Sequence, residues 1–145
     1  MIDPIELLSK LKTHMSSDAV LRVKVPNDFS SFQLLLKKLN YMELNWFKPP
    51  EHLSYFNSHS LKSLLHSQGF NLLSLQAGFS VEQFLINEHS NYYKNESLGK
   101  SVHLTRVLVT NYMAEKNLER MIDYQEAAAD LDFGRLLEAY VKVSD

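Results

Sequence analysis

The scarcity and spacing of glycine constrain this chain more than any other feature. Its 145 residues include four glycines, Gly69, Gly78, Gly99 and Gly134, where average usage of about 7% would give roughly ten. The nearest pair, Gly69 and Gly78, is nine positions apart. Loops that hold nucleotide phosphates need two or three glycines within about six residues, because the backbone must approach the phosphate closely. Neither a dinucleotide fingerprint nor a P-loop can therefore form within these residues.

The composition is that of an average globular chain, with 45% hydrophobic and 22% charged residues, and a chain of this length can bury a sizeable core. A net charge of −2 gives no broad basic excess, so we expect neither nucleic acid nor an anionic membrane as partner. The absence of cysteine excludes disulfides and thiol catalysis. No signal peptide or bilayer-spanning run stands out. We expect one cytoplasmic domain over residues 1–145.

Turn signals and hydrophobic periodicity predict an alternation of helices and strands. Helices between strands favour the α/β or α+β class around a three-stranded sheet. The first two strands are expected to run parallel through a right-handed crossover, whereas the pattern leaves the direction of the last strand open. Leucines and tyrosines at helical spacing between residues 102 and 131 are expected to be core. The predicted elements are a helix from Asp3-Pro4, a strand at 19–25, a helix at 29–39, an irregular segment at 45–56, a helix from about 57 to Gly69, a strand at 71–77, a helix after Ser80, a loop at 89–99, one or two helices over 100–131, and a strand at 135–143.

Local signals place several of these boundaries. Pro26 should end the first strand. Asn27 and Asp28 then suit the N-cap of the following helix, because their side chains accept hydrogen bonds from free backbone N–H groups. Ser80 and Gln83 have the spacing of a capping box, which predicts a helix from this point.

The six histidines do not predict a metal site. His59 and His66 would lie two turns apart on one helix, about 10–11 Å, which is too far to share a metal ion. Pro49 and Pro50 keep His52 outside that helix. No H-E-x-x-H pattern occurs, so we expect no metal-ligating residues.

Two places suit a ligand. Glu51 and His52 lie in a rigid segment rich in aromatics and proline, residues 46–56, where His52 could act as a general base because its pKa lies near neutrality. Asn27 lies at the carboxyl end of the first strand, the edge at which α/β sheets bind ligands. The structural alternatives stay open: the aromatics complete the core, and Glu51, His52 and Asn27 cap helices.

Two stretches together resemble a known family. One is Leu-Arg-Val-Lys-Val-Pro-Asn-Asp at 21–28, after the helix that begins at Asp3-Pro4. The other is Pro-Pro-Glu-His-Leu-Ser-Tyr-Phe at 49–56, followed by a leucine-rich helix and Gly69-Phe70. In this order they resemble the C-terminal half of class I S-adenosylmethionine-dependent methyltransferases of the small-molecule type. The resemblance covers nearly the whole chain.

This resemblance implies a particular sheet. Family members have seven strands, with the last one antiparallel between the fifth and the sixth. Residues 19–25, 71–77 and 135–143 would be strands five, six and seven, giving the order five-seven-six in a partial Rossmann-like fold. Residues 80–131 would be an enlarged helical insertion that caps the substrate.

The resemblance also implies that cofactor binding and substrate binding belong to different halves of the fold. The family's glycine-rich loop and the acidic residue that holds the cofactor ribose belong to the half that precedes strand five, so we expect no cofactor-binding residues here, although S-adenosylmethionine is implied for a complete protein. The positions that carry over are substrate-side: Asn27, Glu51, Tyr55 and Phe56 for binding, and His52 as a base. The expected function is to bind and cap a small-molecule methyl acceptor, without catalysis by this part alone.

A different class of function also fits the sequence. If strand 19–25 lies at an unpaired sheet edge, it offers a template for strand addition, which Arg22 and Lys24 would blunt. The chain would then be a non-catalytic interaction module that forms homo-oligomers or binds a missing N-terminal half. An independent small enzyme that uses His52 as base is a third alternative.

Overall fold

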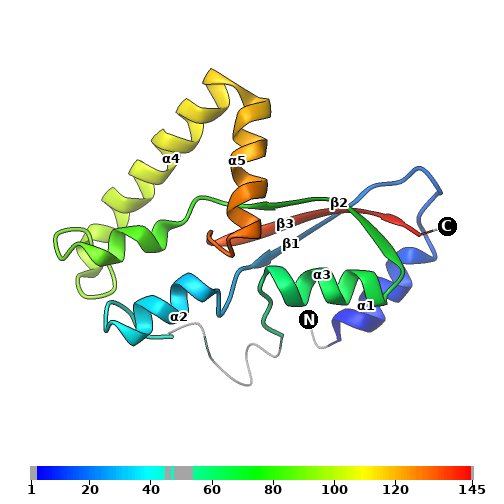
Figure 1. The fold of residues 1–145 in the computed structure, drawn as a ribbon, viewed down its shortest axis with the longest axis horizontal. Coiled ribbons are helices and arrows are strands. Elements are labelled where there is room, and N and C mark those ends of the chain that lie inside the picture. Colours follow the sequence, from blue (N-terminus) through cyan, green and yellow to red (C-terminus); the bar gives the residue numbers. More distant parts are fainter. Residues whose placement is uncertain (1–2, 45–46, 48–53, 145) are drawn as a thin grey trace.

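The structure is a computed structural model that describes residues 3–44, 47 and 54–144. It is an α/β fold built on a three-stranded sheet, as predicted (Figure 1). No helix among the described residues is long and apolar enough to cross a membrane. The elements are α1 (Pro4–Lys12), β1 (Leu21–Pro26), α2 (Ser31–Lys38), α3 (Ser58–Ser67), β2 (Phe70–Ala77), the 3-10 helices η1 (Val81–Ile86) and η2 (Glu96–Leu98), α4 (Gly99–Lys116), α5 (Leu118–Asp130) and β3 (Leu136–Val143).

The last strand lies in the middle of the sheet. The order is β1-β3-β2, and β3 is antiparallel to both neighbours. This confirms the order five-seven-six and the antiparallel last strand. β1 and β2 run in the same direction, as expected for a parallel pair, but β3 separates them. Val25 lies opposite Leu137, which lies opposite Ala77, so these three side chains share one face of the sheet.

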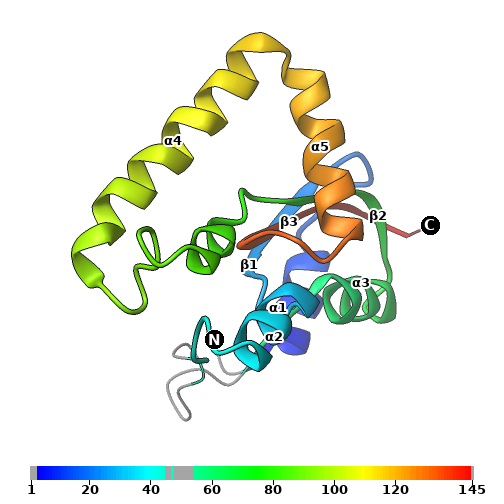
Figure 2. The same cartoon turned by 60° about the vertical axis from the view of Figure 1, so that its left-hand side comes forward.

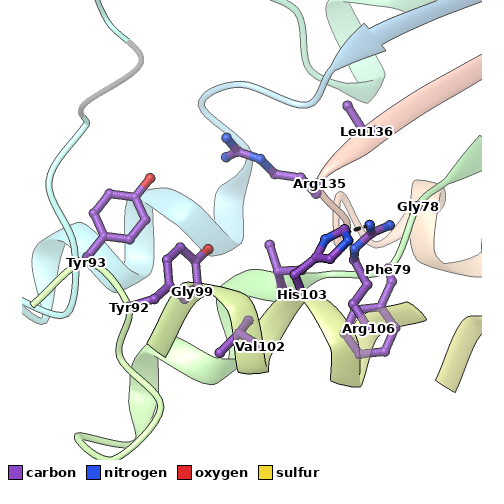
Figure 3. Close-up of a pocket in the computed structure, with 11 residues that line it drawn as sticks. Gly78, Phe79, Tyr92, Tyr93, Gly99, Val102, His103, Arg106, Arg135 and Leu136 are labelled. Carbon is purple, nitrogen blue, oxygen red and sulfur yellow. Dashed lines mark hydrogen bonds between the residues drawn. The ribbon is translucent and has the colours of Figure 1, made fainter. Parts of the chain in front are cut away.

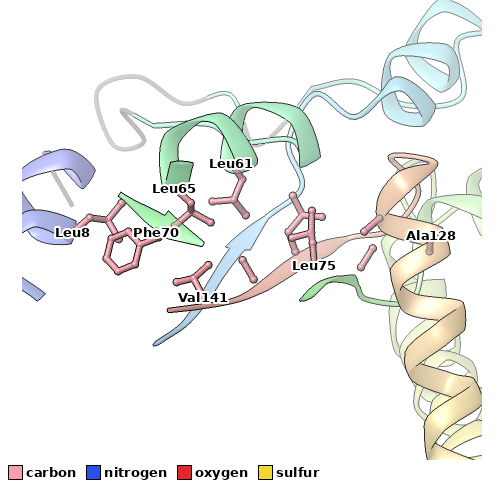
Figure 4. Close-up of a cluster of buried hydrophobic side chains, with 11 residues drawn as sticks. Leu8, Leu61, Leu65, Phe70, Leu75, Ala128 and Val141 are labelled. Carbon is pink, nitrogen blue, oxygen red and sulfur yellow. The ribbon is translucent and has the colours of Figure 1, made fainter. Parts of the chain in front are cut away.

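The main core fills the space between that face and helices α1 and α3 (Figure 4). Alternate β3 residues point into it because successive side chains of a strand face opposite ways. The C-terminal end of α5 closes the cluster, and the Ser58 hydroxyl ties α3 to it by donating to the Ala129 carbonyl at 2.7 Å. The buried members are Leu8, Leu61, Leu65, Phe70, Leu75, Ala77, Ala128, Ala129, Leu137, Ala139 and Val141.

The other face of the sheet is charged. Glu138 of β3 accepts from Arg22 Nε at 2.8 Å and forms an ion pair with Lys24 at 2.7 Å. Both cations lie on β1 and alternate with Leu21, Val23 and Val25 along the strand. The alternation in the sequence thus gives β1 one apolar and one charged side.

β1 ends at Pro26, as predicted, and the proline is the last residue of the strand. It lies opposite Leu136 in the ladder. The N–H of Asn27 donates to the Arg135 carbonyl at 3.0 Å, and backbone groups alternate in direction along a strand, so the amide position of Pro26 faces away from β3. The missing N–H therefore costs no ladder hydrogen bond, which is where proline is tolerated in a sheet.

The prediction that Asn27 and Asp28 cap the next helix is wrong. Phe29 has a φ of +56°, which no α-helix contains, so the helix cannot begin before Ser30. The Ser30 hydroxyl is the cap and accepts from the Gln33 N–H at 3.3 Å. By contrast, the predicted start of α3 and the role of a terminal glycine after it are confirmed.

The segment after β2 differs from its prediction. Residues 81–86 form the 3-10 helix η1, and the Ser80 side chain makes no cap hydrogen bond. Its hydroxyl donates to Glu82 Oε2 at 3.4 Å instead, while Gln83 Nε2 donates to the Ser80 carbonyl at 2.9 Å. The capping-box prediction is therefore wrong, because the Ser80 hydroxyl donates to a carboxylate instead of accepting from the Gln83 N–H.

The region left open as one helix or two is a pair, α4 and α5, which rises from the sheet as a V (Figures 1 and 2). Asn117 breaks it with an extended φ of −166° and caps α5 by accepting from the Arg120 N–H at 3.0 Å. The expectation that its leucines and tyrosines are core is wrong, because α4 leans away from the sheet and buries only Val102. The leucines and tyrosines of this region that are exposed are Leu104, Leu108, Tyr112, Leu118, Tyr124 and Leu131.

Candidate functional site

A pocket of about 370 Å³ lies at the edge of the sheet where β1 and β2 end and β3 begins. Gly78 and Phe79, directly after β2, and Arg135 and Leu136, at the start of β3, form its sheet side. The Gly78 N–H donates to the Leu136 carbonyl at 2.7 Å and holds the two strands together there. Ligand pockets have volumes of about 300–1,000 Å³, and α/β sheets bind ligands at the carboxyl ends of their strands.

The walls of the pocket differ in chemistry (Figure 3). Tyr92 and Tyr93 come from the loop after η1 and lie on one side. His103 and Arg106 come from α4 and lie together on the other, because residues three apart share a helix face. Arg135 lies near both walls, so the pocket combines aromatic rings with basic groups.

A buried carboxylate anchors Arg135. Glu82 is 1% exposed and accepts from Arg135 Nη1 at 3.2 Å, Gln33 Nε2 at 3.0 Å and Ser80 Oγ at 3.4 Å. A buried charge needs a partner and hydrogen bonds, and Glu82 has both. The pair thereby neutralises Arg135 and joins α2, η1 and the start of β3 into one wall.

The two tyrosines are hydrogen-bond donors at physiological pH. Burial raises the pKa of Tyr92, and the negative charge of Glu82 raises it further. Burial also raises the pKa of Tyr93, which outweighs the opposing positive charge of Arg135. Both phenols therefore stay protonated.

Arg106 contacts a neutral group. Its Nη2 lies 3.1 Å from His103 Nδ1. A guanidinium can only donate, so Nδ1 accepts and the proton of the neutral imidazole is on Nε2. Within residues 3–44, 47 and 54–144, no carboxylate lies within ion-pair distance of Arg106, so this guanidinium has no ion-pair partner there, although the negative charge of Asp28 acts on the nearby Tyr93.

A second concave surface, the β1 groove, lies beside the outer edge of β1. It has a volume of about 230 Å³ and is lined by α1, β1 and α3. On α1, Leu8 is buried, while Leu7 and Leu11 line the groove and are exposed. The groove is therefore an apolar surface adjoining a strand edge.

Comparison with known proteins places the chain in a family. A family model described as a methyltransferase domain matches residues 1–75, just over half of the 145 residues. The chain belongs to this methyltransferase domain family. No curated protein and no solved structure matches it. The matched part of the methyltransferase domain contains the β1 groove, whereas the pocket residues lie between Gly78 and Leu136.

Asn27, predicted to bind substrate in this methyltransferase domain, is fully buried. Its Nδ2 donates to the Gly134 carbonyl at 3.0 Å and fastens the end of β1 to the turn before β3. Its Oδ1 has no hydrogen-bond partner among the described residues. Asn27 donates its backbone N–H to the Arg135 carbonyl but is not among the residues that line the pocket, and its binding role stays a prediction.

Of the other predicted site residues, the two that the structure describes pack in different places. The Tyr55 ring packs against Phe29 and Phe47, with centroids 5.5 Å from each. Phe56 packs against the main core and lines the β1 groove. Glu51 and His52 lie outside the described residues. Of the four positions, the two that the structure describes, Tyr55 and Phe56, do not line the pocket of the methyltransferase domain, and the roles predicted for all four stay predictions.

Sequence reasoning missed the pocket residues. The adjacent Tyr92-Tyr93 pair and the i, i+3 spacing of His103 and Arg106 were visible signals. Glu82 gave no local signal, because its partner Arg135 is 53 residues away. A search for paired basic and aromatic residues within 80–131 would have found part of the site.

Proposed function

We propose that this methyltransferase domain binds and caps a small methyl acceptor, and that a cofactor-binding part completes the enzyme at the open edge of β1. That part can belong to the same polypeptide or to another. The observation that carries the proposal is an unpaired strand edge beside an apolar groove, at the position where the family's sheet continues.

The edge of β1 offers backbone groups for pairing. Because the Asn27 N–H points to β3, the backbone groups of Val23 and Val25 do so as well, and those of Arg22 and Lys24 point outward. No strand pairs with that side of β1 within the described part of the chain. Unpaired edges of this kind are templates for another strand.

The β1 groove offers side chains for the same contact. Leu7 and Leu11, four residues apart on α1, form an apolar face that lines the groove and is exposed to solvent. Apolar patches that exceed scattered single residues mark interfaces. A partner strand along β1 would cover this face together with the strand edge, which favours one partner for both.

The cofactor does not fit the residues at hand. S-adenosylmethionine would supply the electrophilic methyl group, and its family site needs a glycine-rich loop that four dispersed glycines cannot form. The pocket beside Arg106 thus suits the acceptor rather than the donor. We propose that the domain alone is not catalytic.

A fusion tests this function. The N-terminal half of a small-molecule class I methyltransferase, ending after its fourth strand, is joined by a flexible linker ahead of Asp3. We expect the fusion to bind S-adenosylmethionine in calorimetry and to protect the amides of Arg22 and Lys24 from hydrogen exchange. The unfused chain should do neither. Tight cofactor binding by the unfused chain, or unprotected Arg22 and Lys24 amides in the fusion, would refute the proposal.

A matched pair of variants locates the contact. Leu7→Glu places a charge in the β1 groove and should abolish the protection of the β1 amides in the fusion. Leu131→Glu makes the same change at a position that is 73% exposed and does not line the groove, and it should leave protection unchanged. Equal effects of the two would argue against docking at β1.

The non-catalytic interaction module is the second candidate, and the same open edge favours it. It predicts self-association of the unfused chain that rises with concentration and is lost in Leu7→Glu. Sedimentation velocity separates the two candidates, because the first requires no self-association. A monomer at high concentration would remove the second.

A further inference from the structure

We propose that the pocket between α4 and the start of β3 binds a planar organic anion, with the acidic group on Arg106 and His103 and the ring beside Tyr92 and Tyr93. As a statement of the acceptor's chemical class, this inference rests on the proposed function. As a statement of binding, it concerns the residues of this chain alone.

The guanidinium of Arg106 favours an anionic ligand. Arg135 is neutralised by Glu82, whose carboxylate oxygens are already engaged by three donors. Arg106 has no carboxylate partner among the described residues. The Arg106 guanidinium is thus available to a ligand carboxylate or phosphate, which would form strong charge-assisted hydrogen bonds with it in this partly enclosed site.

His103 and Arg106 form a double donor. Their contact at 3.1 Å consumes one N–H of Arg106 and the Nδ1 lone pair of His103. The remaining guanidinium N–H groups and the Nε2–H of the imidazole stay as donors. Two adjacent donors on one helix face suit the two oxygens of a single acidic group.

The opposite wall of the pocket, formed by Tyr92 and Tyr93, favours a ligand with a planar ring. Tyr92 and Tyr93 have centroids 5.3 Å apart, and both line the pocket together with the apolar side chains of Val102 and Leu136. Aromatic walls recognise flat ring faces through offset or edge contacts. A volume of about 370 Å³ accommodates a ring system with an acidic substituent. An inorganic anion would leave this wall without contacts.

Four probes separate charge from shape. The chain is titrated with 2-naphthoate, with the neutral isostere 2-naphthamide, with decahydro-2-naphthoate as a non-planar anion, and with inorganic phosphate, by calorimetry and by amide chemical shifts of α4. We expect 2-naphthoate to bind about tenfold or more tightly than each of the other three, since one hydrogen-bonded charge is worth about that factor. Equal affinity for naphthoate and naphthamide would refute the anion site. Equal affinity for naphthoate and either of the other two anions would refute the ring.

Matched variants assign the residues. Arg106→Gln should weaken 2-naphthoate about tenfold and leave 2-naphthamide unchanged. Arg120→Gln removes the same charge from an exposed site on α5 and should leave both affinities unchanged. Should Arg106→Gln fail to fold by circular dichroism, Arg106→Lys keeps the charge but not the planar fork, and a severalfold loss is expected. No loss in any folded Arg106 variant would overturn the assignment.

This test is separate from the fusion experiment. Naphthoate binding needs no cofactor-binding part, so its failure would refute the acceptor class and leave docking at β1 standing. Failure of the fusion with intact naphthoate binding would refute the proposed assembly and leave the anion pocket standing.

Discussion

Replacing Glu82 by glutamine removes a charge from the interior while keeping the size of the side chain. Gln33 can still donate to the new amide oxygen, so the main loss is the partner of Arg135. Breaking a fully buried ion pair costs about 3–5 kcal/mol. The Arg135 side chain is 36% exposed, and water in part screens the charge that has lost this carboxylate. We therefore expect Glu82→Gln to lower the free energy of unfolding by about 2–3 kcal/mol.

The matched control is Glu138→Gln, the same change on the charged face of the sheet. Its partners Arg22 and Lys24 have side chains 54% and 47% exposed, and such pairs contribute about 1 kcal/mol or less. Urea unfolding followed by circular dichroism measures both variants. Losses for Glu82→Gln no larger than for Glu138→Gln would refute the burial argument.

A double-mutant cycle isolates the pair itself. Arg135→Met removes the cation, and the double variant Glu82→Gln with Arg135→Met leaves neither charge behind. Since most of the single-variant loss comes from an uncompensated charge, the double variant should be more stable than the sum of the two losses predicts, by about 1–2 kcal/mol. Strict additivity would show that Glu82 and Arg135 act independently.

Three further outcomes follow from the geometry. Gly134→Ala should cost about 2–3 kcal/mol, because φ is +152° and a Cβ would lie 2.5 Å from the Gly78 carbonyl oxygen, whereas Gly99→Ala, with open space and helical φ, should gain about 0.4–1 kcal/mol; thermal melts compare them. Burial raises the pKa of Glu138, but hydrogen bonds from its two cross-strand cations outweigh this and hold the pKa below its usual value. Its stabilisation is therefore present above the unfolded pKa of about 4.3 and lost as pH falls through the lower folded value. Below the folded-state pKa, the urea midpoint of the unchanged protein should converge with that of Glu138→Gln. Asn117→Ala should cost about 1 kcal/mol through loss of the α5 cap, measured by urea unfolding.

Elements with local signals were predictable. Asp3 caps α1 by accepting from the Ile5 and Glu6 N–H groups, and Gly69 adopts a φ of +74° after α3; both follow from short-range rules. The strand order came from the family resemblance rather than from periodicity, because a pattern of alternating residues does not specify which strands are neighbours.

The errors lie where distant contacts decide the backbone. Phe29 takes a positive φ that its residue type disfavours, and its ring packs edge-on against Phe47 and Tyr55 from later in the chain. Because of this positive φ, α2 begins later than predicted, and the Asn27 side chain hydrogen-bonds Gly134, 107 residues away, instead of capping the helix. No sequence window contains both partners, so capping rules applied to Asn27 gave the wrong role.

The pocket was not predicted because most of its contacts also join residues that are distant in the sequence. Its anchoring contacts join Glu82 to Gln33 and to Arg135, 49 and 53 residues apart. Only the pair on α4, His103 and Arg106, is close in sequence. The aromatic segment that held the predicted base is described at Phe47, Tyr55 and Phe56, and the last two pack into two different clusters.

The position of β3 connects the two surfaces of the domain. Pro26 at the end of β1 pairs with Leu136, and the neighbouring Arg135 carries the pocket wall. Strands are about 4.8 Å apart, so a strand docked on β1 would lie only two strand spacings from β3. If that strand runs parallel to β1, its carboxyl end reaches the same edge of the sheet as the pocket. A methyl donor bound by the completing part would then face the acceptor bound here, which is the arrangement that a transfer between two separately built half-sites requires.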